Sequence, residues 1–255
     1  MNITDTHCHL YLPDFDEDRD LVIDRAEKEG VNKFYLPGID STVINPMLAL
    51  ENKYPGRCFA TMGLHPCSVK ENYEEELRIV EDWLQKRKFS AVGEIGLDFY
   101  WDTSFSEQQY DAFARQVKLA RKHASPILIH SRNSTKECID TVAKNTGDNL
   151  TGIFHCFSGT KEEAGFIIEM GFYLGIGGVI TYKNSGLADV VASLPLEHIV
   201  LETDAPYLTP VPFRGKRNES SYLAYVLKKV SEVKNISPEA VAEITTRNAQ
   251  KIFGN

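Results

Sequence analysis

The chain has 255 residues, of which 42% are hydrophobic and 25% are charged, a composition typical of globular proteins that excludes collagen-like, disordered and coiled-coil classes. The 28 lysine and arginine residues stand against 36 aspartate and glutamate residues, giving a net charge of −8, so non-specific coating of nucleic acid or anionic lipid is not expected. Every apolar run is shorter than the roughly 18 residues that indicate a membrane-spanning helix.

Along the chain, short apolar runs rich in β-branched or aromatic residues alternate with amphipathic helical stretches. The runs predict strands over Ile3–Leu10, Lys33–Ile39, Cys58–His65, Ala91–Leu97, Pro126–Ser131, Leu150–Phe157, Phe172–Ile180 and His198–Asp204. The helical stretches are Asp18–Glu29, Thr42–Lys53, Glu74–Lys86, Ser106–Lys122, Thr135–Lys144, Thr160–Met170, Leu187–Leu194, Tyr222–Val233 and Pro238–Phe253. This alternation predicts βαβ units and a parallel sheet.

Eight strand–helix units in about 250 residues favour a single (β/α)₈ TIM-type barrel over residues 1–255. The alternative is an open, doubly wound sheet, but His7 and His9 stand after the first strand, where that fold usually has a glycine-rich phosphate loop. Two helices have the pattern of a capping box, at Ser106 and at Thr160, and Ser237–Pro238 is a third helix start.

Five of the seven histidines lie at or near the predicted C-terminal ends of strands: His7, His9, His65, His130 and His155. Strand C-ends meet at one face of a parallel barrel, the face on which active sites are built. Glu94 and Asp204 lie at the same level on the fourth and eighth strands. Buried imidazoles and carboxylates gathered in one place favour a metal site, because unpaired charges there would be costly.

Six candidate ligands exceed what one catalytic metal takes, so two divalent cations are expected. Glu94 is the candidate for the bridging carboxylate. One ion would be held by His7, His9, Glu94 and Asp204, and the other by Glu94, His130 and His155. Imidazole-rich sites suit Zn²⁺ or Mn²⁺, whereas Mg²⁺ prefers oxygen, so the identity of the metal stays open.

These residues stand in motifs that resemble the TatD family of metal-dependent deoxyribonucleases, within the amidohydrolase-like barrels. The matching segments include Thr4–Leu10, Gly63–Pro66, Val92–Asp98, Pro126–Arg132, His155–Gly159, Leu201–Leu208 and Pro212–Asn218. The resemblance implies the ligand set given above, a divalent-metal site that Mg²⁺ is able to support, and hydrolysis of DNA, often with 3′→5′ exonuclease action. Single-stranded or frayed DNA ends are therefore the expected substrate, without an obligatory protein partner.

Roles for the remaining polar residues are hypotheses. Asp204 would accept a proton from the attacking water, in addition to binding metal. Asp5 stands two residues before His7, and Glu202 two residues before Asp204, so each points to the same side of its strand as that ligand. Both would orient the ligands or form a buried polar layer. His65 would contact a phosphate oxygen or form a structural hydrogen bond.

Basic residues near the mouth are the candidates for holding the substrate: Arg132, Arg214 and Arg217. Tyr100, Trp101 and Phe105 form an aromatic cluster that would line the path of the strand or simply pack the loop. The alternatives are another hydrolase of the same barrel type, acting on a lactone, amide or ester, and a non-catalytic barrel adaptor.

Cellular location and thiol state follow from weaker signals. The N-terminus has no secretory pattern, and five scattered cysteines without a CxxC pair favour reduced thiols, so a cytoplasmic protein with no membrane association is expected. The parity of the strands turns Cys8 and Cys156 away from the neighbouring histidines, which predicts that both pack in the core.

Overall fold

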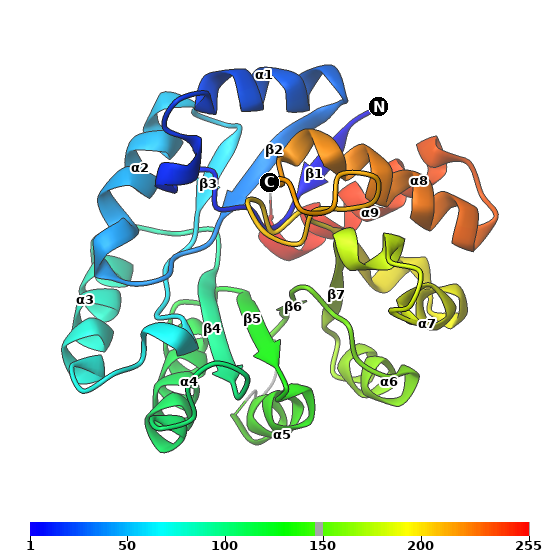
Figure 1. Cartoon of the computed structure of the whole chain (residues 1–255). Coiled ribbons are helices and arrows are strands. Elements are labelled where there is room, and N and C mark those ends of the chain that lie inside the picture. The colour runs from blue at the N-terminus through cyan, green and yellow to red at the C-terminus, as the bar shows by residue number, and fades with distance from the viewer. Residues whose placement is uncertain (146–149, 255) are drawn as a thin grey trace.

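The computed structural model describes residues 1–145 and 150–254, so the predicted domain over 1–255 includes a few residues, 146–149 and 255, that lie outside the described part. Within that part, eight short strands follow one another around the centre of the molecule, with helices outside them (Figure 1). The strands are β1 Ile3–Asp5, β2 Val31–Leu36, β3 Cys58–Ala60, β4 Val92–Asp98, β5 Ile127–Arg132, β6 Gly152–Phe154, β7 Tyr173–Ile176 and β8 Ile199–Leu201.

All paired strands run parallel, as a three-stranded sheet β1–β2–β3 and a five-stranded sheet β4–β8 in sequence order. Backbone bridges join the two sheets at both seams. Met62, after β3, pairs with Val92, and Cys8, after β1, pairs with Ala205 after β8. The strand order and these seams give the TIM-type barrel that the sequence predicts.

The helices cover the outside of the strands, as Figure 1 shows. They are α1 Arg19–Lys28, α2 Ile44–Lys53, α3 Tyr73–Lys86, α4 Ser106–Lys122, α5 Thr135–Asn145, α6 Lys161–Glu169, α7 Leu187–Ser193, α8 Leu223–Lys234 and α9 Pro238–Phe253. Short 3₁₀ helices lie at η1 Pro13–Phe15, η2 Ser41–Val43, η3 Pro66–Ser68, η4 Gly178–Thr181, η5 Leu196–His198 and η6 Ser220–Tyr222. Among the described residues, no helix combines the length and apolar content needed to cross a membrane.

A small apolar floor fills the barrel beneath the mouth. Leu128, Ile153 and Val200 are fully buried there, each two residues before a polar residue of the mouth and therefore on the same inner face of its strand. Ala249 and Ile252 of α9 pack against this group from the N-terminal ends of the strands. The floor leaves the polar side chains at the opposite, C-terminal end.

Several predicted strands extend too far at their C-terminal ends. As a result, five predicted site residues lie in the loops that follow strands: His7, His9, His65, His155 and Asp204. Cys156 and Asp204 have φ of 48° and 56°, a left-handed conformation that an extended strand cannot contain. Glu94 and His130, in contrast, lie inside β4 and β5.

Two of the predicted helix starts are confirmed. Thr160 and Glu163 form a reciprocal capping box at α6, and the Ser237 hydroxyl accepts a hydrogen bond from Ala240 N at α9. The capping box at Ser106 is wrong. The Ser106 hydroxyl donates to Thr103 O instead, and the partner of the pattern, Gln109, uses its side-chain oxygen to accept from Asp98 N at the end of β4.

Candidate metal centre

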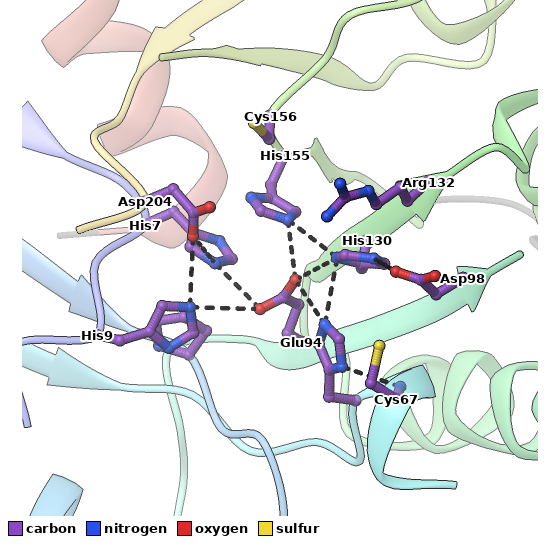
Figure 2. Close-up of polar contacts among 12 residues, drawn as sticks. His7, His9, Cys67, Glu94, Asp98, His130, Arg132, His155, Cys156 and Asp204 are labelled. Carbon is purple, nitrogen blue, oxygen red and sulfur yellow. Dashed lines mark hydrogen bonds and ion pairs between the residues drawn. The ribbon is translucent and has the colours of Figure 1, made fainter. Parts of the chain in front are cut away.

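Six predicted ligands converge at the C-terminal mouth of the barrel. Figure 2 shows them pointing toward a common centre: His7, His9, Glu94, His130, His155 and Asp204. They come from β4, from β5 and from the loops that follow β1, β6 and β8. The parallel strands explain this convergence, since each contributes only one or two side chains to the same end of the barrel.

Glu94 lies between two groups of imidazoles. Its Oε2 is 3.1 Å from His7 Nε2 and 3.7 Å from His9 Nε2. Its Oε1 is 2.9 Å from His130 Nδ1 and 2.8 Å from His155 Nε2. The side chain is 2% exposed, so each oxygen faces one group and both are shielded from water.

Asp204 completes the first group. Its Oδ1 lies 3.5 Å from His9 Nε2 and 3.7 Å from His7 Nε2. Its backbone N donates to His7 O, which fixes the turn after β8 against the loop after β1. At 13% exposure, the Asp204 side chain is more accessible than Glu94.

Hydrogen-bond acceptors lie behind two of the imidazoles, those of His9 and His130, and a carboxylate lies behind that of His155 without forming a hydrogen bond. His9 Nδ1 is 2.8 Å from the Tyr11 hydroxyl, which itself donates to Pro37 O and therefore accepts from the ring. His155 Nδ1 lies 3.4 Å from Glu202 Oε1. With the proton on Nδ1, both rings turn the lone pair of Nε2 toward the centre, as metal-binding histidines do.

Asp98 does the same for His130, and sequence reasoning missed this role. Asp98 Oδ2 is 2.8 Å from His130 Nε2 and accepts its proton, so in the neutral ring that metal binding requires the lone pair is on Nδ1, the nitrogen that faces Glu94. The signal was present in the sequence, since Asp98 shares the inward parity of Glu94 at the end of the same strand. Tyr11 was missed as well, although it stands two residues after His9.

The donor set fits a divalent cation. Lone pairs of imidazoles and carboxylate oxygens converge in a buried space, where acceptors facing acceptors repel one another. Both ring nitrogens of His7 are buried and have no hydrogen-bond partner among the described residues. Three sets of residues each have their ligand atoms within 4.8 Å of one another. The sets are His7 with His155 and Asp204, His7 with His9 and Glu94, and His65 with Glu94 and His130. A cation removes this repulsion between acceptors and gives one of the two His7 ring nitrogens a partner.

Burial and neighbouring charges have opposite effects on the pKa values of the groups in the centre. Burial raises the pKa of Glu94, but the imidazoles of His155, His7 and His65 outweigh it and hold that pKa well below its usual range. Burial, aided by His155, lowers the pKa of His7. An ionised carboxylate beside the neutral His7 imidazole is the protonation state that metal binding requires. Burial lowers the pKa of His155, but Glu94 outweighs it and raises that pKa well above its usual value, so a cation there would displace a proton.

His65 reaches the same centre but faces it with a proton. Its Nδ1 accepts a hydrogen bond from Cys67 N at 3.0 Å, so a neutral ring carries its hydrogen on Nε2. That nitrogen lies 3.3 Å from Glu94 Oε1 and 3.2 Å from His130 Nδ1. We therefore place His65 among the hydrogen-bond donors of the site and not among the ligands, although it lies close to Glu94 and His130.

The two carboxylates predicted to orient ligands differ in what they contact. Glu202 lies behind the His155 ring, as described above, and also accepts from Cys156 N at 2.5 Å. Asp5 instead accepts from Thr203 N, from the Thr203 hydroxyl and from the Ser220 hydroxyl, and burial raises its pKa to about 7. It also accepts from His7 N at 3.4 Å, so it fixes the backbone of His7 and the backbone next to Asp204, not the ring of a ligand imidazole.

The three predicted substrate arginines are placed differently. Arg132 and Arg214 are exposed and stack on aromatic rings, those of Tyr100 and Tyr182, each at 3.9 Å from guanidinium carbon to ring centroid. Arg217 is bound in a bidentate ion pair with Asp18, at 2.8 Å for both contacts. The expectation that Arg217 binds substrate stays a prediction, and a substrate phosphate would compete with Asp18 for its guanidinium.

The cysteines near the centre are not its ligands. Cys8 is fully buried, as predicted, with its Sγ 3.6 Å from Tyr35 O. Cys156 is only partly buried, contrary to the prediction of core packing, because its left-handed backbone lifts it out of β6. Burial and the nearby carboxylates raise the pKa of the Cys156 thiol well above its usual value, which keeps it protonated.

Imidazoles and carboxylates at the C-terminal mouth of a parallel barrel define a metal-dependent hydrolase. The sequence profile of the family described as TatD related DNase matches residues 4–254, and the chain belongs to this family. Its fold also matches the crystal structure of the TatD homologue YjjV from Escherichia coli, with a TM-score of 0.94, 31% identity and coverage of 99% of this chain and 98% of that one.

Curated relatives agree with this assignment. YabD of Bacillus subtilis, named as an uncharacterized metal-dependent hydrolase, is 38% identical over 250 residues, covering 98% of each chain. The 3′-5′ ssDNA/RNA exonuclease TatD of Erwinia billingiae is 30% identical over 255 residues, again covering 98% of each. The family resemblance predicted from the motifs is thereby confirmed.

Proposed function

We propose that this protein is a divalent-metal-dependent deoxyribonuclease that hydrolyses DNA phosphodiester bonds as a 3′→5′ exonuclease on single-stranded ends, through a two-metal site. The observation that carries this proposal is the position of Glu94, whose Oε2 faces His7 and His9 while its Oε1 faces His130 and His155. A carboxylate between two groups is the bridge that a two-metal hydrolase needs. The name of the Erwinia billingiae relative supports a nucleic-acid substrate.

The residues that would hold the cations follow from the lone pairs that face the centre. His7, His9, Glu94 and Asp204 would hold one, and Glu94, His130 and His155 the other. Mg²⁺, Mn²⁺ and Zn²⁺ are all compatible with this mixture of nitrogen and oxygen donors. When bound, such cations lower the pKa of water and polarise a phosphoryl oxygen.

The side chains around the centre supply positioning and proton transfer. Asp204, the more exposed carboxylate, would accept the proton of the attacking water. His65 would donate from Nε2 to a phosphate oxygen, since its tautomer is fixed by Cys67 N. Arg132 and Arg214 would bind the phosphates on either side, because guanidinium groups pair well with phosphate.

An assay with end-labelled single-stranded DNA and added Mg²⁺ or Mn²⁺ tests the proposal. We expect immediate release of a 3′ label as mononucleotide, a ladder from a 5′ label, and loss of both in Glu94→Ala. Absence of metal-dependent release, together with turnover of a lactone or carboxylic ester, would overturn the proposal in favour of another hydrolase activity.

The base role of Asp204 has its own test. Asp204→Asn keeps the shape of the side chain and removes its basicity, so we expect turnover to fall by about 10²–10⁴-fold while part of the metal is retained. Turnover and metal content are measured on the same preparation, with Asp189→Asn, an exposed carboxylate of α7, as the control. A variant with full metal content and full turnover would show that Asp204 is only a ligand.

A further inference from the structure

Two large aromatic side chains stand exposed just after β4. Trp101 is 68% exposed and Tyr100 is 51% exposed, although the exposure of large aromatic rings to water is unfavourable in free energy. Their ring centroids are 4.9 Å apart and nearly perpendicular, at 86°. Neighbouring exposed aromatics of this kind usually mark a contact surface.

Arg132 joins this pair to the metal centre. Its guanidinium carbon lies 3.9 Å from the Tyr100 ring centroid and 5.2 Å from that of Trp101. In Figure 2 its side chain extends from the end of β5 toward the side of the centre formed by His130 and His155. Within the described part of the chain, no acceptor bonds its guanidinium, so its donors remain available to an anion.

The backbone beneath the aromatic pair is fixed to the same centre. Tyr100 N and Trp101 N donate to Asp98 Oδ1 at 2.9 and 3.1 Å, and Asp98 Oδ2 contacts His130 Nε2. The adjacent Phe99 N donates to Arg132 O at 2.9 Å. One carboxylate thus sets the position of the aromatic pair relative to a metal-binding imidazole, and the pair is not a freely moving loop tip.

We propose that Tyr100, Trp101 and Arg132 form a stacking platform for an unpaired nucleobase of the substrate, with Arg132 binding the phosphate attached to it. This inference rests on the proposed nuclease function and extends it to substrate selection. Aromatic faces stack on any base, so the platform tolerates sequence but requires a base that is not paired. It therefore selects single-stranded over duplex ends.

Binding to the intact protein tests the platform without any need for hydrolysis. The sequence contains two tryptophans, so Trp83→Phe leaves Trp101 as the only indole reporter. The probes are a phosphorothioate oligothymidylate, which resists cleavage, and an oligomer with the same phosphates but no bases. We expect the oligothymidylate to quench Trp101 fluorescence and the abasic oligomer to bind about tenfold more weakly with little quenching.

Variants supply the matched comparison. Trp101→Ala should weaken binding of the oligothymidylate about tenfold and leave binding of the abasic oligomer unchanged, whereas Trp101→Phe should keep most of the affinity. The exposed position makes misfolding of these variants unexpected, and circular dichroism checks it. Equal affinity of the two oligomers, or unchanged affinity in Trp101→Ala, would overturn the platform.

Failure of the platform and failure of the nuclease proposal give different results. If the protein cleaves labelled DNA but Trp101→Ala has unchanged KM and kcat, the nuclease proposal stands and the platform falls. If base-dependent quenching occurs and no cleavage is found with any metal, the platform stands and the nuclease proposal falls.

Discussion

At the scale of single residues, the candidate metal centre is defined by the groups behind the ligands as much as by the ligands themselves. Tyr11 and Asp98 each take the outer proton of one imidazole, so that a neutral ring leaves a lone pair facing inward, and the Glu202 carboxylate lies 3.4 Å behind a third imidazole, that of His155. A histidine without such a partner is able to turn either nitrogen inward. These acceptors therefore determine that the site is ready to bind a cation.

Asp98→Asn tests this at one position. The amide cannot accept the His130 proton as strongly, so we expect divalent-metal affinity to fall about 10–100-fold, measured by isothermal titration. Asp102→Asn is the matched control, because Asp102 lies in the loop that follows Asp98 but pairs with Lys70 at 2.7 Å. Equal metal affinities for the two variants would contradict a role of Asp98 in orienting His130.

At the scale of secondary-structure elements, helix starts depend on whether the side chains of a motif are free to cap. At α6, Thr160 and Glu163 face solvent and complete the capping box. At α4, Gln109 is buried and is needed at the end of β4, so the same sequence pattern gives no box. A tertiary hydrogen bond of Gln109 therefore prevents the capping box that the local sequence pattern predicts.

Thr160→Ala and Ser106→Ala separate the two cases. We expect Thr160→Ala to lower the free energy of unfolding by about 1 kcal/mol, because the N–H of Glu163 loses its acceptor. Ser106→Ala should change it by less than about 0.5 kcal/mol. Urea unfolding of both variants provides the measurement, and losses of equal size would show that the distinction between the two helix starts is wrong.

At the scale of the whole molecule, ion pairs join the first helix to the loop that follows the last strand. Arg217 binds Asp18, and Arg25 binds both Asp18 and Glu219. These contacts bring together segments about 200 positions apart in the chain. They also explain why the loop after β8 lies against α1.

Acid should weaken this junction. The hydrogen bond from Arg217 lowers the pKa of Asp18 below its ordinary 3.8; burial raises the pKa of Glu219, but Arg25 outweighs it and holds that pKa below its ordinary 4.5. A carboxylate with a depressed folded pKa contributes stability above its ordinary value and loses it as the pH falls through the folded value. We therefore expect the free energy of unfolding to fall as the pH drops below about 4.5.

Urea unfolding at pH 7 and pH 3.5 measures this loss. Asp18→Asn should be less stable than the natural chain at pH 7 and closer to it at pH 3.5, because the neutral amide does not titrate. Asp24→Asn, on the exposed face of α1, should follow the pH dependence of the natural chain. A parallel pH dependence in Asp18→Asn would show that this ion pair contributes nothing to acid stability.

The sequence by itself predicts the barrel and the six converging ligands, because strand periodicity and strand C-ends are local properties of the chain. The barrel and the family are confirmed, and the two-metal assignment stays a proposal. Strand ends were the least predictable feature, since left-handed residues such as Cys156 and Asp204 have no strong sequence signal.

Only the tertiary structure decides which polar groups meet across the mouth. It assigns Asp98 to His130, gives the neutral His65 ring a fixed tautomer through Cys67, and pairs Arg217 with Asp18. These choices depend on contacts between segments far apart in sequence. The pattern of the chain therefore predicts where donors and acceptors gather, while the packing of the barrel determines which of them are already paired and which remain for a cation or a nucleotide.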